Sequence, residues 1–114
     1  MRTMENENLR VQISDHGAEL SSIYDKAADR EAVWTGDPAF WNRHAPVLFP
    51  FVGRLTGGQY RLHGKVYPMS IHGFAAASEF SVLEQSADTV TLALRDNEET
   101  LRQYPLHFEF RVRY

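Results

Sequence analysis

The sequence has no cysteine among its 114 residues and no long hydrophobic run. The absence of cysteine excludes disulfide bonds and thiolate ligands to a metal. No apolar stretch approaches the ~20 residues that a membrane-spanning helix requires. The first ten residues, MRTMENENLR, lack the apolar segment of a secretory signal. We therefore expect a cytoplasmic protein with no membrane partner.

The sequence also lacks a marked excess of charge of one sign. Its 12 Lys and Arg residues are scattered among 15 Asp and Glu residues, which gives a formal net charge of -3. Nucleic-acid-binding proteins usually gather basic residues on one face, so we expect no nucleic-acid partner. A content of 43% apolar and 24% charged residues is typical of a globular protein. The length fits one domain, residues 1–114.

Familiar metal, nucleophile and cofactor motifs are missing as well. The five histidines, His16, His44, His63, His72 and His107, form no pair at metal-ligand spacing and have no acidic neighbour in a ligand motif. There is no Gly-x-Ser-x-Gly elbow, no phosphate-binding loop and no Gly-x-Gly-x-x-Gly fingerprint. We expect neither a metal ion nor a cofactor.

What the chain does contain is a series of short β-strands separated by turn residues, so the predicted fold class is all-β. Alternating apolar and polar residues predict strands over residues 9–13, 19–24, 32–35, 59–62, 65–69, 78–84, 89–95 and 106–114. Residues 96–104 form the one convincing helix, with Asp96 or Asn97 as its cap and Pro105 as its stop.

Two turns follow from local residue preferences. His63 and Gly64 separate two predicted strands and favour a type I′ turn, because Gly64 takes a positive φ without steric strain. Asp37 precedes Pro38, an order that favours a turn or a single helical turn through Trp41 with Asp37 as its cap.

Trp34, Phe40 and Trp41 lie close together in the sequence. Exposed aromatic faces commonly stack on sugar rings, but core packing is the more common fate of such residues. We expect at least two of the three to be buried.

Arg54 interrupts the apolar stretch LFPFVGRL, residues 48–55. Pro50 cannot donate to a strand ladder, and Gly53 allows the chain to bend just before the arginine. A guanidinium placed there could hydrogen-bond the hydroxyls or carboxylate of a ligand at the rim of a cavity. A salt bridge to one of the acidic residues is the alternative.

His72 lies in the second candidate motif, SIHGFA, residues 70–75. It follows a predicted strand and precedes Gly73, which lets the backbone turn sharply or approach a ligand closely. A histidine can donate, accept or shuttle a proton near neutral pH. The alternative is a histidine satisfied by a backbone carbonyl.

The last predicted strand is still alternating at Tyr114, with Leu106, Phe108, Phe110 and Val112 on the same face. Because an unpaired apolar edge favours association, the sequence predicts either the amino-terminal part of a larger all-β protein or self-association into a homo-oligomer through this edge. The other alternative is an edge strand that ends the domain.

The order of these motifs resembles the aldose 1-epimerase (galactose mutarotase) family, in particular its LacX-like bacterial branch. The matching stretches are GAEL at 17–20, VWTGDPAFW at 33–41, APVLFPFVGRL at 45–55, YRLHGKVYPMSIHGFA at 60–75 and YPLHFEFRVRY at 104–114. The resemblance covers nearly the whole chain after its first residues.

The resemblance implies an antiparallel β-sandwich, the amino-terminal portion of a β-supersandwich, with a cleft that binds a monosaccharide such as galactose or glucose. It implies an isomerase without a cofactor, in which a carboxylate base deprotonates the anomeric hydroxyl and a histidine protonates the ring oxygen. By position, Arg54 resembles the substrate-binding arginine. His72 resembles the first of two active-site histidines, a catalytic and substrate-binding residue.

The chain departs from the family pattern in two respects. The family's second histidine and its glutamate base have no counterpart among these residues, so we expect a catalytically incomplete chain. Ala76 stands where this branch often has an arginine after His-Gly-Phe-Ala. A preference for phosphorylated sugars is a further alternative, although no basic cluster accompanies Arg54.

Overall fold

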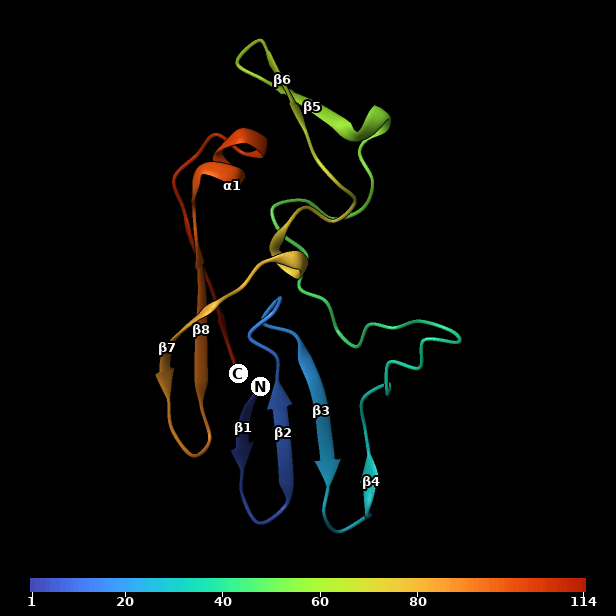
Figure 1. Ribbon diagram of the computed structural model, residues 1–114. Coiled ribbons are helices and arrows are strands. Elements are labelled where there is room, and N and C mark those ends of the chain that lie inside the picture. The colour runs from blue at the N-terminus through green and yellow to red at the C-terminus, as the bar shows by residue number, and fades with distance from the viewer.

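The computed structural model describes residues 1–114 and is built almost entirely from short antiparallel strands (Figure 1). The strands are β1 Arg2–Glu5, β2 Leu9–Ile13, β3 Leu20–Asp25, β4 Arg30–Glu31, β5 Gln59–Leu62, β6 Lys65–Pro68, β7 Ser81–Gln85, β8 Val90–Arg95 and β9 Glu109–Arg113. The helical elements are α1, Glu98–Gln103, and two 3-10 turns, η1 Thr56–Gly58 and η2 Ala75–Ala77. With six residues α1 cannot cross a bilayer, and the structure holds no longer helix.

The first sheet has the order β1-β2-β3-β4, with every neighbouring pair antiparallel. The predicted strand at 9–13 is confirmed as β2, and the one at 19–24 is confirmed with a shift of one residue as β3. Sequence patterning missed β1, because only Met4 of its four residues is buried and no apolar alternation marks it. What makes these residues a strand is their antiparallel pairing with residues 10–13 of β2.

The predicted strand at 32–35 is wrong, because the chain leaves the sheet after β4. The Glu31 carboxylate accepts hydrogen bonds from the amides of Ile23 and Val33 at 2.8 and 2.9 Å and from the Ser22 hydroxyl at 2.5 Å. The Ala32 amide still donates to the Ile23 carbonyl at 2.8 Å, but the Glu31 side chain takes the place of the return bond from the Ile23 amide. The Ser22 hydroxyl, followed by these amides, holds the pKa of Glu31 below its ordinary value.

Strands β5 and β6 form a separate two-stranded sheet that projects from the rest of the molecule (Figure 1). His63 and Gly64 have φ values of 50° and 76°, so the predicted type I′ turn is confirmed. The predicted turn at residues 37–41 is also confirmed. There, the amides of Phe40 and Trp41 donate to the Asp37 carbonyl at 3.0 and 2.9 Å.

The third sheet has the order β7-β8-β9, and α1 lies in the connection between β8 and β9. Of the two predicted caps, Asn97 is the one used: its side chain accepts from the Thr100 amide at 2.9 Å, and the Thr100 hydroxyl accepts from the Asn97 amide at 2.9 Å. The final strand begins only at Glu109, so Leu106 is exposed rather than on the buried face. The Asp96 carboxylate accepts a hydrogen bond from the Phe108 amide just before the chain enters β9.

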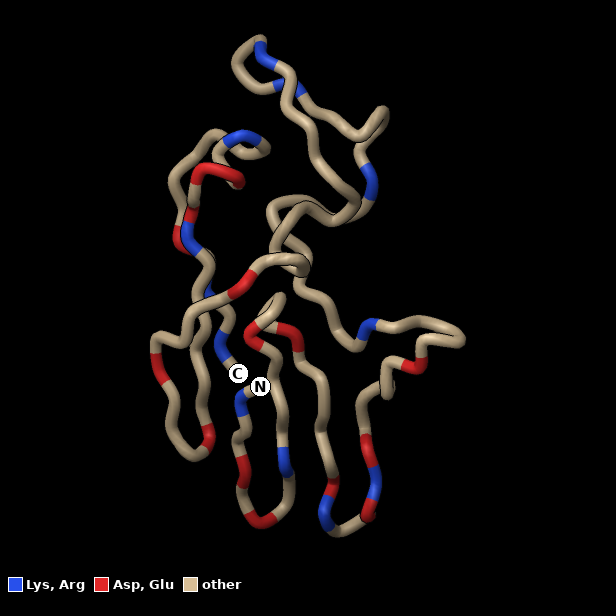
Figure 2. The backbone as a smooth tube through the Cα atoms, viewed as in Figure 1, with Lys and Arg blue, Asp and Glu red and all other residues tan.

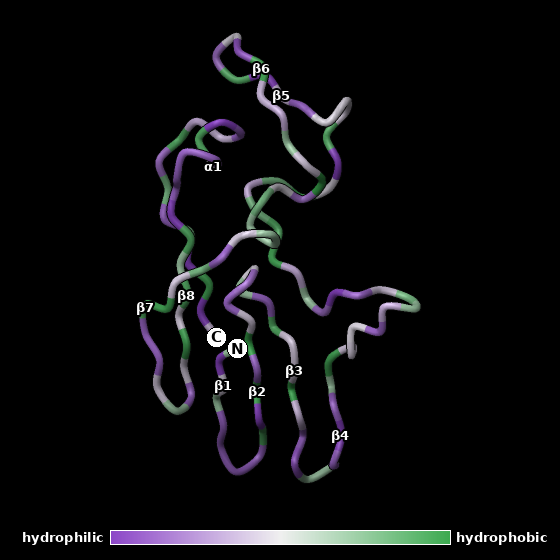
Figure 3. The backbone as a smooth tube through the Cα atoms, viewed as in Figure 1, coloured by the Kyte–Doolittle hydropathy of each residue, from purple (hydrophilic) through white to green (hydrophobic).

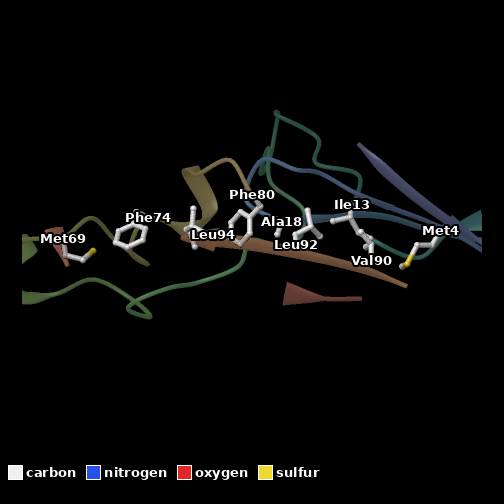
Figure 4. Close-up of a cluster of buried hydrophobic side chains, with 10 residues drawn as sticks. Met4, Ile13, Ala18, Met69, Phe74, Phe80, Val90, Leu92 and Leu94 are labelled. Carbon is white, nitrogen blue, oxygen red and sulfur yellow. The ribbon is translucent and has the colours of Figure 1, made fainter. Parts of the chain in front are cut away.

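The core lies between the first and third sheets, as in a β-sandwich (Figure 4). Ile13 from β2 and Val90 and Leu92 from β8 are fully buried, and Leu94 is 5% exposed. The prediction that Val90, Leu92 and Leu94 share a buried face is confirmed, but Thr91 and Ala93 are buried as well, so both faces of β8 are covered. The Tyr114 hydroxyl, just after β9, donates to the Ala18 carbonyl, just before β3, at 2.9 Å. This bond links the third sheet to the first. The all-β, antiparallel sandwich class is confirmed.

Trp34, Phe40 and Trp41 are 43%, 80% and 49% exposed, so the expectation that at least two would be buried is wrong. They lie in the irregular segment between β4 and η1. There, the Trp34 indole donates to the Trp41 carbonyl at 2.8 Å and meets the Phe40 ring edge-on at 6.3 Å. The three residues stabilise one another locally instead of joining the core.

Charged residues of both signs are spread along the chain (Figure 2). Several form ion pairs, and Arg2 binds both oxygens of Asp15 at 2.9 and 2.8 Å. This hydrogen-bonded guanidinium lowers the pKa of Asp15. The His107 ring lowers the pKa of Asp96, and Arg111 followed by Arg95 lowers that of Glu109.

These lowered pKa values predict a loss of stability in acid. A carboxylate whose folded-state pKa is depressed contributes stability above its unfolded pKa of about 4, and this contribution disappears as the pH falls through the folded value. We expect the free energy of unfolding, measured by urea titration, to decrease steadily below about pH 5. Asp15→Asn and Arg2→Met should each flatten this slope, and the double variant should flatten it no further. A larger effect in the double variant would show that the pair does not act as one unit.

Candidate functional site

The two candidate motifs meet in the middle of the molecule, where apolar connecting segments cross (Figure 3). The Phe49 carbonyl accepts hydrogen bonds from the amides of Phe74 and Ala75 at 3.0 and 3.1 Å. Gly73 lies against the same carbonyl: a Cβ built at this position would be 2.3 Å from the Phe49 oxygen. Only glycine fits here. Any other residue would place its Cβ against the Phe49 carbonyl, and it would also be strained by the φ of +77°.

Aromatic packing holds the same junction from the other side. The Phe49 ring stacks on Phe110 of β9 with 4.3 Å between centroids, and it contacts Phe108, Phe74 and Tyr104 at 5.2 to 6.1 Å. The junction is therefore attached both to the third sheet and to the end of α1. Aromatic pairs of this kind contribute about 0.5–1.5 kcal/mol each beyond the area that they bury.

His72 is bonded to Gly53 by a reciprocal pair of hydrogen bonds. The His72 amide donates to the Gly53 carbonyl at 2.9 Å, and the Gly53 amide donates to Nδ1 of the His72 ring at 2.8 Å. A ring nitrogen that accepts a hydrogen bond carries no proton, so the proton of the neutral ring lies on Nε2. His72 is therefore held as a donor through Nε2. The alternative of a histidine satisfied by a backbone carbonyl does not describe this ring.

The backbone of His72 is itself unusual, with φ at +63°. A non-glycine residue in the left-handed region is uncommon and requires support from its surroundings. The two bonds to Gly53 supply that support. Histidine is one of the residue types that tolerate this conformation better than most.

A cleft of about 630 Å³ opens beside this junction. One wall is the SIHGFA segment with the residues that follow it, and a second comes from the segment 41–48. A third comes from α1 and its cap. The lining residues are Trp41, Arg43, Pro46, Leu48, Ser70, Ile71, His72, Gly73, Phe74, Ala76, Ala77, Ser78, Asn97, Glu99, Thr100 and Gln103. His72 thus lies where sequence reasoning expects a ligand to bind.

Arg54 has a different position. It is exposed, it makes no hydrogen bond or ion pair within the chain, and it is absent from the lining of the cleft. The alternative of a structural salt bridge is therefore not what the structure has. Arg54 directly follows Gly53, which is hydrogen-bonded to His72, so Arg54 begins next to the junction. Its role in binding stays a prediction.

Sequence reasoning missed two residues of this region, Glu19 and Arg43. The side chain of Glu19 is 8% exposed, and its Oε1 accepts from the amides of His44 and Ala45 at 2.7 and 3.0 Å. Its Oε2 accepts from Nη2 and Nε of Arg43 at 3.2 and 3.4 Å. Nη2 of Arg43 also donates to the Ala76 carbonyl at 3.1 Å. The only sequence signal was the match of GAEL, which marks Glu19 but not its partner.

The acidic residue of the cleft is Glu99, which pairs with Arg102 one turn later on α1 and accepts from Gln103 Nε2 at 3.2 Å. No group of three or more His, Asp and Glu side chains gathers in a geometry that could hold a metal ion. The cleft therefore offers hydrogen-bond donors and aromatic surface rather than a cluster of ligands.

Comparison with known proteins identifies the family of the chain. The sequence profile of the family described as aldose 1-epimerase matches residues 1–114. The chain belongs to the aldose 1-epimerase family. The chromosomal protein LacX of Lactococcus lactis subsp. lactis is 37% identical to this aldose 1-epimerase homologue over 116 residues, which cover 97% of the chain and 38% of LacX.

Two solved structures share the fold of this aldose 1-epimerase homologue closely. A galactose mutarotase related enzyme from Lactobacillus acidophilus has a TM-score of 0.96 and 48% identity, covering 99% of this chain and 38% of its own. A galactose mutarotase-like protein from Lactobacillus casei has a TM-score of 0.97 and 47% identity, covering 100% and 39%. The chain thus spans about two fifths of the length of its relatives.

The close contact at Gly73 generates a test with a matched control. Gly73→Ala should lower the free energy of unfolding by several kcal/mol, on the order of 3, because the new Cβ meets backbone atoms in addition to left-handed strain. Gly53→Ala has a φ of +87° but nothing within 4 Å of its Cβ, so it should lose only the strain of about 1–2 kcal/mol. Urea unfolding measures both. Equal losses would show that the Phe49 contact is unimportant.

Proposed function

We propose that this chain is an aldose 1-epimerase-like carbohydrate-binding protein that is catalytically incomplete. The observation that carries the proposal is His72, a residue matching the family motif, held as an Nε2 donor in the lining of a cleft. Its ligand is a free hexose such as galactose or glucose. The proposal includes a cytoplasmic location and binding without a metal or cofactor.

The size and chemistry of the cleft support a sugar ligand. A volume of about 630 Å³ lies within the range of small-molecule sites, about 300–1,000 Å³. Trp41 offers an aromatic face, and His72, Ser70 and Asn97 offer polar atoms around it. In this proposal Arg54 approaches the sugar from the neighbouring segment and donates to a second hydroxyl.

Catalytic incompleteness is proposed because the cleft has no available base. The family reaction needs a carboxylate that removes the anomeric proton and a histidine that protonates the ring oxygen. Glu99 is the one carboxylate in the lining, and it is paired with Arg102. General acid–base catalysis accounts for about 10²–10⁴-fold of rate, so binding without these groups gives little acceleration.

Polarimetry on freshly dissolved α-galactose or α-glucose tests the catalytic part. We expect mutarotation at the spontaneous rate in the presence of the protein, while NMR titration with the same sugar detects binding. A rate well above the spontaneous one, lost on changing His72, would contradict the proposed incompleteness. No binding of any hexose would contradict the sugar-binding function.

His72 offers a pair of variants that separate its ring donor from its structural role. In His72→Asn the Oδ1 atom can replace Nδ1 as acceptor for Gly53, and asparagine tolerates a positive φ, so melting should stay near that of the parent. The Nε2 donor is lost, so the affinity for hexose should fall about threefold to tenfold. His72→Ala leaves the Gly53 amide without its acceptor and should also destabilise the fold by about 1–3 kcal/mol. Unchanged affinity in His72→Asn would exclude the ring as a ligand donor.

A second candidate function, a non-catalytic self-associating β-module, is favoured by the free edge of β9. Val90 and Tyr114 exchange both ladder hydrogen bonds, so the backbone groups of Glu109, Arg111 and Arg113 point to the open side. The molecule is also thin, at 56 × 34 × 15 Å. Its 7323 Å² of accessible surface exceeds the about 6,400 Å² of a compact protein of this mass by roughly the area that one partner buries in a standard interface.

Two substitutions at Arg111 test association through this edge. Arg111→Pro removes an outward amide at a position where an edge strand accepts proline, and should convert a dimer to a monomer in sedimentation velocity. Arg111→Gln keeps the amide and removes only the charge, so it should leave the dimer in place. A parent protein that sediments as a monomer at all concentrations would exclude this candidate.

A further inference from the structure

Arg43, which sequence reasoning passed over, is the arginine that lines the cleft. Its side chain is 35% exposed, whereas the Glu19 side chain behind it is 8% exposed. It shares the lining with Trp41 and His72. About a third of the Arg43 side chain is therefore accessible, although two of its nitrogens are hydrogen-bonded.

The hydrogen bonds of Arg43 show which part remains accessible. Nε and Nη2, the side-on pair of donors, both bind Oε2 of Glu19, and Nη2 also donates to the Ala76 carbonyl. Nη1 makes no hydrogen bond within the chain. Because the guanidinium group is planar, fixing Nε and Nη2 also fixes the direction of the two N–H bonds of Nη1. These bonds point away from Glu19.

Glu19 is well suited to hold the arginine in one orientation. Its other oxygen is bound by the amides of His44 and Ala45, so the carboxylate cannot rotate away without losing its bonds to four donor atoms. His44, the residue after Arg43, is thus bound through its amide to the same carboxylate as the Arg43 guanidinium. A donor held this way loses little conformational freedom when a ligand binds.

The charges around the cleft point to an uncharged ligand. Glu19 balances Arg43, and Arg102 balances Glu99. Arg43 and Glu99 are the lining residues that carry a fixed charge, and each has a partner of opposite charge. The paired charges leave no net positive charge to attract a phosphate or carboxylate, whereas a hydroxyl can accept from Nη1 without disturbing the pair.

We propose that Arg43 is a second ligand-binding residue of the cleft, whose Nη1 donates a hydrogen bond to one hydroxyl group of an uncharged sugar. This inference rests on the proposed sugar-binding function and assigns it a specificity-determining donor. Glu19 is the positioning residue: it acts through Arg43 and does not contact the ligand.

The test compares Arg43→Lys with the parent protein, using galactose and its 2-, 3-, 4- and 6-deoxy analogues in NMR titrations. Lysine can still pair with Glu19, but it cannot present a second, fixed donor. We expect Arg43→Lys to bind galactose about tenfold more weakly. One deoxy analogue should bind the parent more weakly than galactose does, and should bind Arg43→Lys as well as galactose does. Arg61→Lys, at an exposed position of β5 outside the cleft, controls for the exchange itself.

The possible results are separable. If the parent binds no hexose, both the proposed function and this inference fail. If the parent binds and Arg43→Lys binds equally well, only the role of Arg43 fails. Equal weakening of galactose and all four analogues would show that Arg43 only supports the fold, and would also overturn the inference. Thermal melting of each variant confirms that the protein remains folded.

Discussion

The carbonyl of Phe49 is the contact on which the candidate site depends. It accepts two amides, those of Phe74 and Ala75, while Gly73 passes close against it. Without this junction, the LFPFVGRL and SIHGFA segments would share only the bonds between Gly53 and His72. Two irregular segments hold their relative position because one backbone carbonyl accepts two amides and so uses both of its acceptor positions. The aromatic ring of the same residue ties the junction to the third sheet.

The strain at His72 follows from that junction. A histidine at φ +63° is held in place by bonds at both its amide and its ring, so the strain is local and its support is rigid. The ring orientation and the tautomer are then set by the same two bonds. A side chain that is pre-oriented in this way can donate to a ligand without losing further rotamer freedom. Glycine or asparagine would adopt this backbone conformation with less strain, and the ligand role proposed above would account for a histidine at this position.

Periodicity predicted the elements that bury one face and failed where side chains replace the ladder. The alternation of β9 gave its more buried face, and Asn97 was among the predicted caps, whereas β8 is buried on both faces. The end of the first sheet could not be predicted, because Glu31 ends it by binding amides through its side chain. The exposed Trp34 was also missed, since hydrophobicity alone does not say whether a loop is covered. In the candidate site, the family motif marked His72, but the sequence did not show that its ring is held by Gly53, 19 residues earlier in the chain.

Arg43 and Arg54 show why the rest of the site was beyond reach. Arg54 is conspicuous in the sequence because apolar residues surround it, yet apolar neighbours in the chain do not determine where a long side chain points. Arg43 is inconspicuous, and its position depends on Glu19, 24 residues earlier in the chain. An ion pair between such distant residues leaves no local pattern. It is visible only after the sheet has brought GAEL beneath the segment 41–48. Arg43 lines the cleft and Arg54 does not, so the two arginines would meet a bound hexose from different places. In the proposed function, His72 and Arg43 contact the sugar inside the cleft, and Arg54 approaches it from the neighbouring segment.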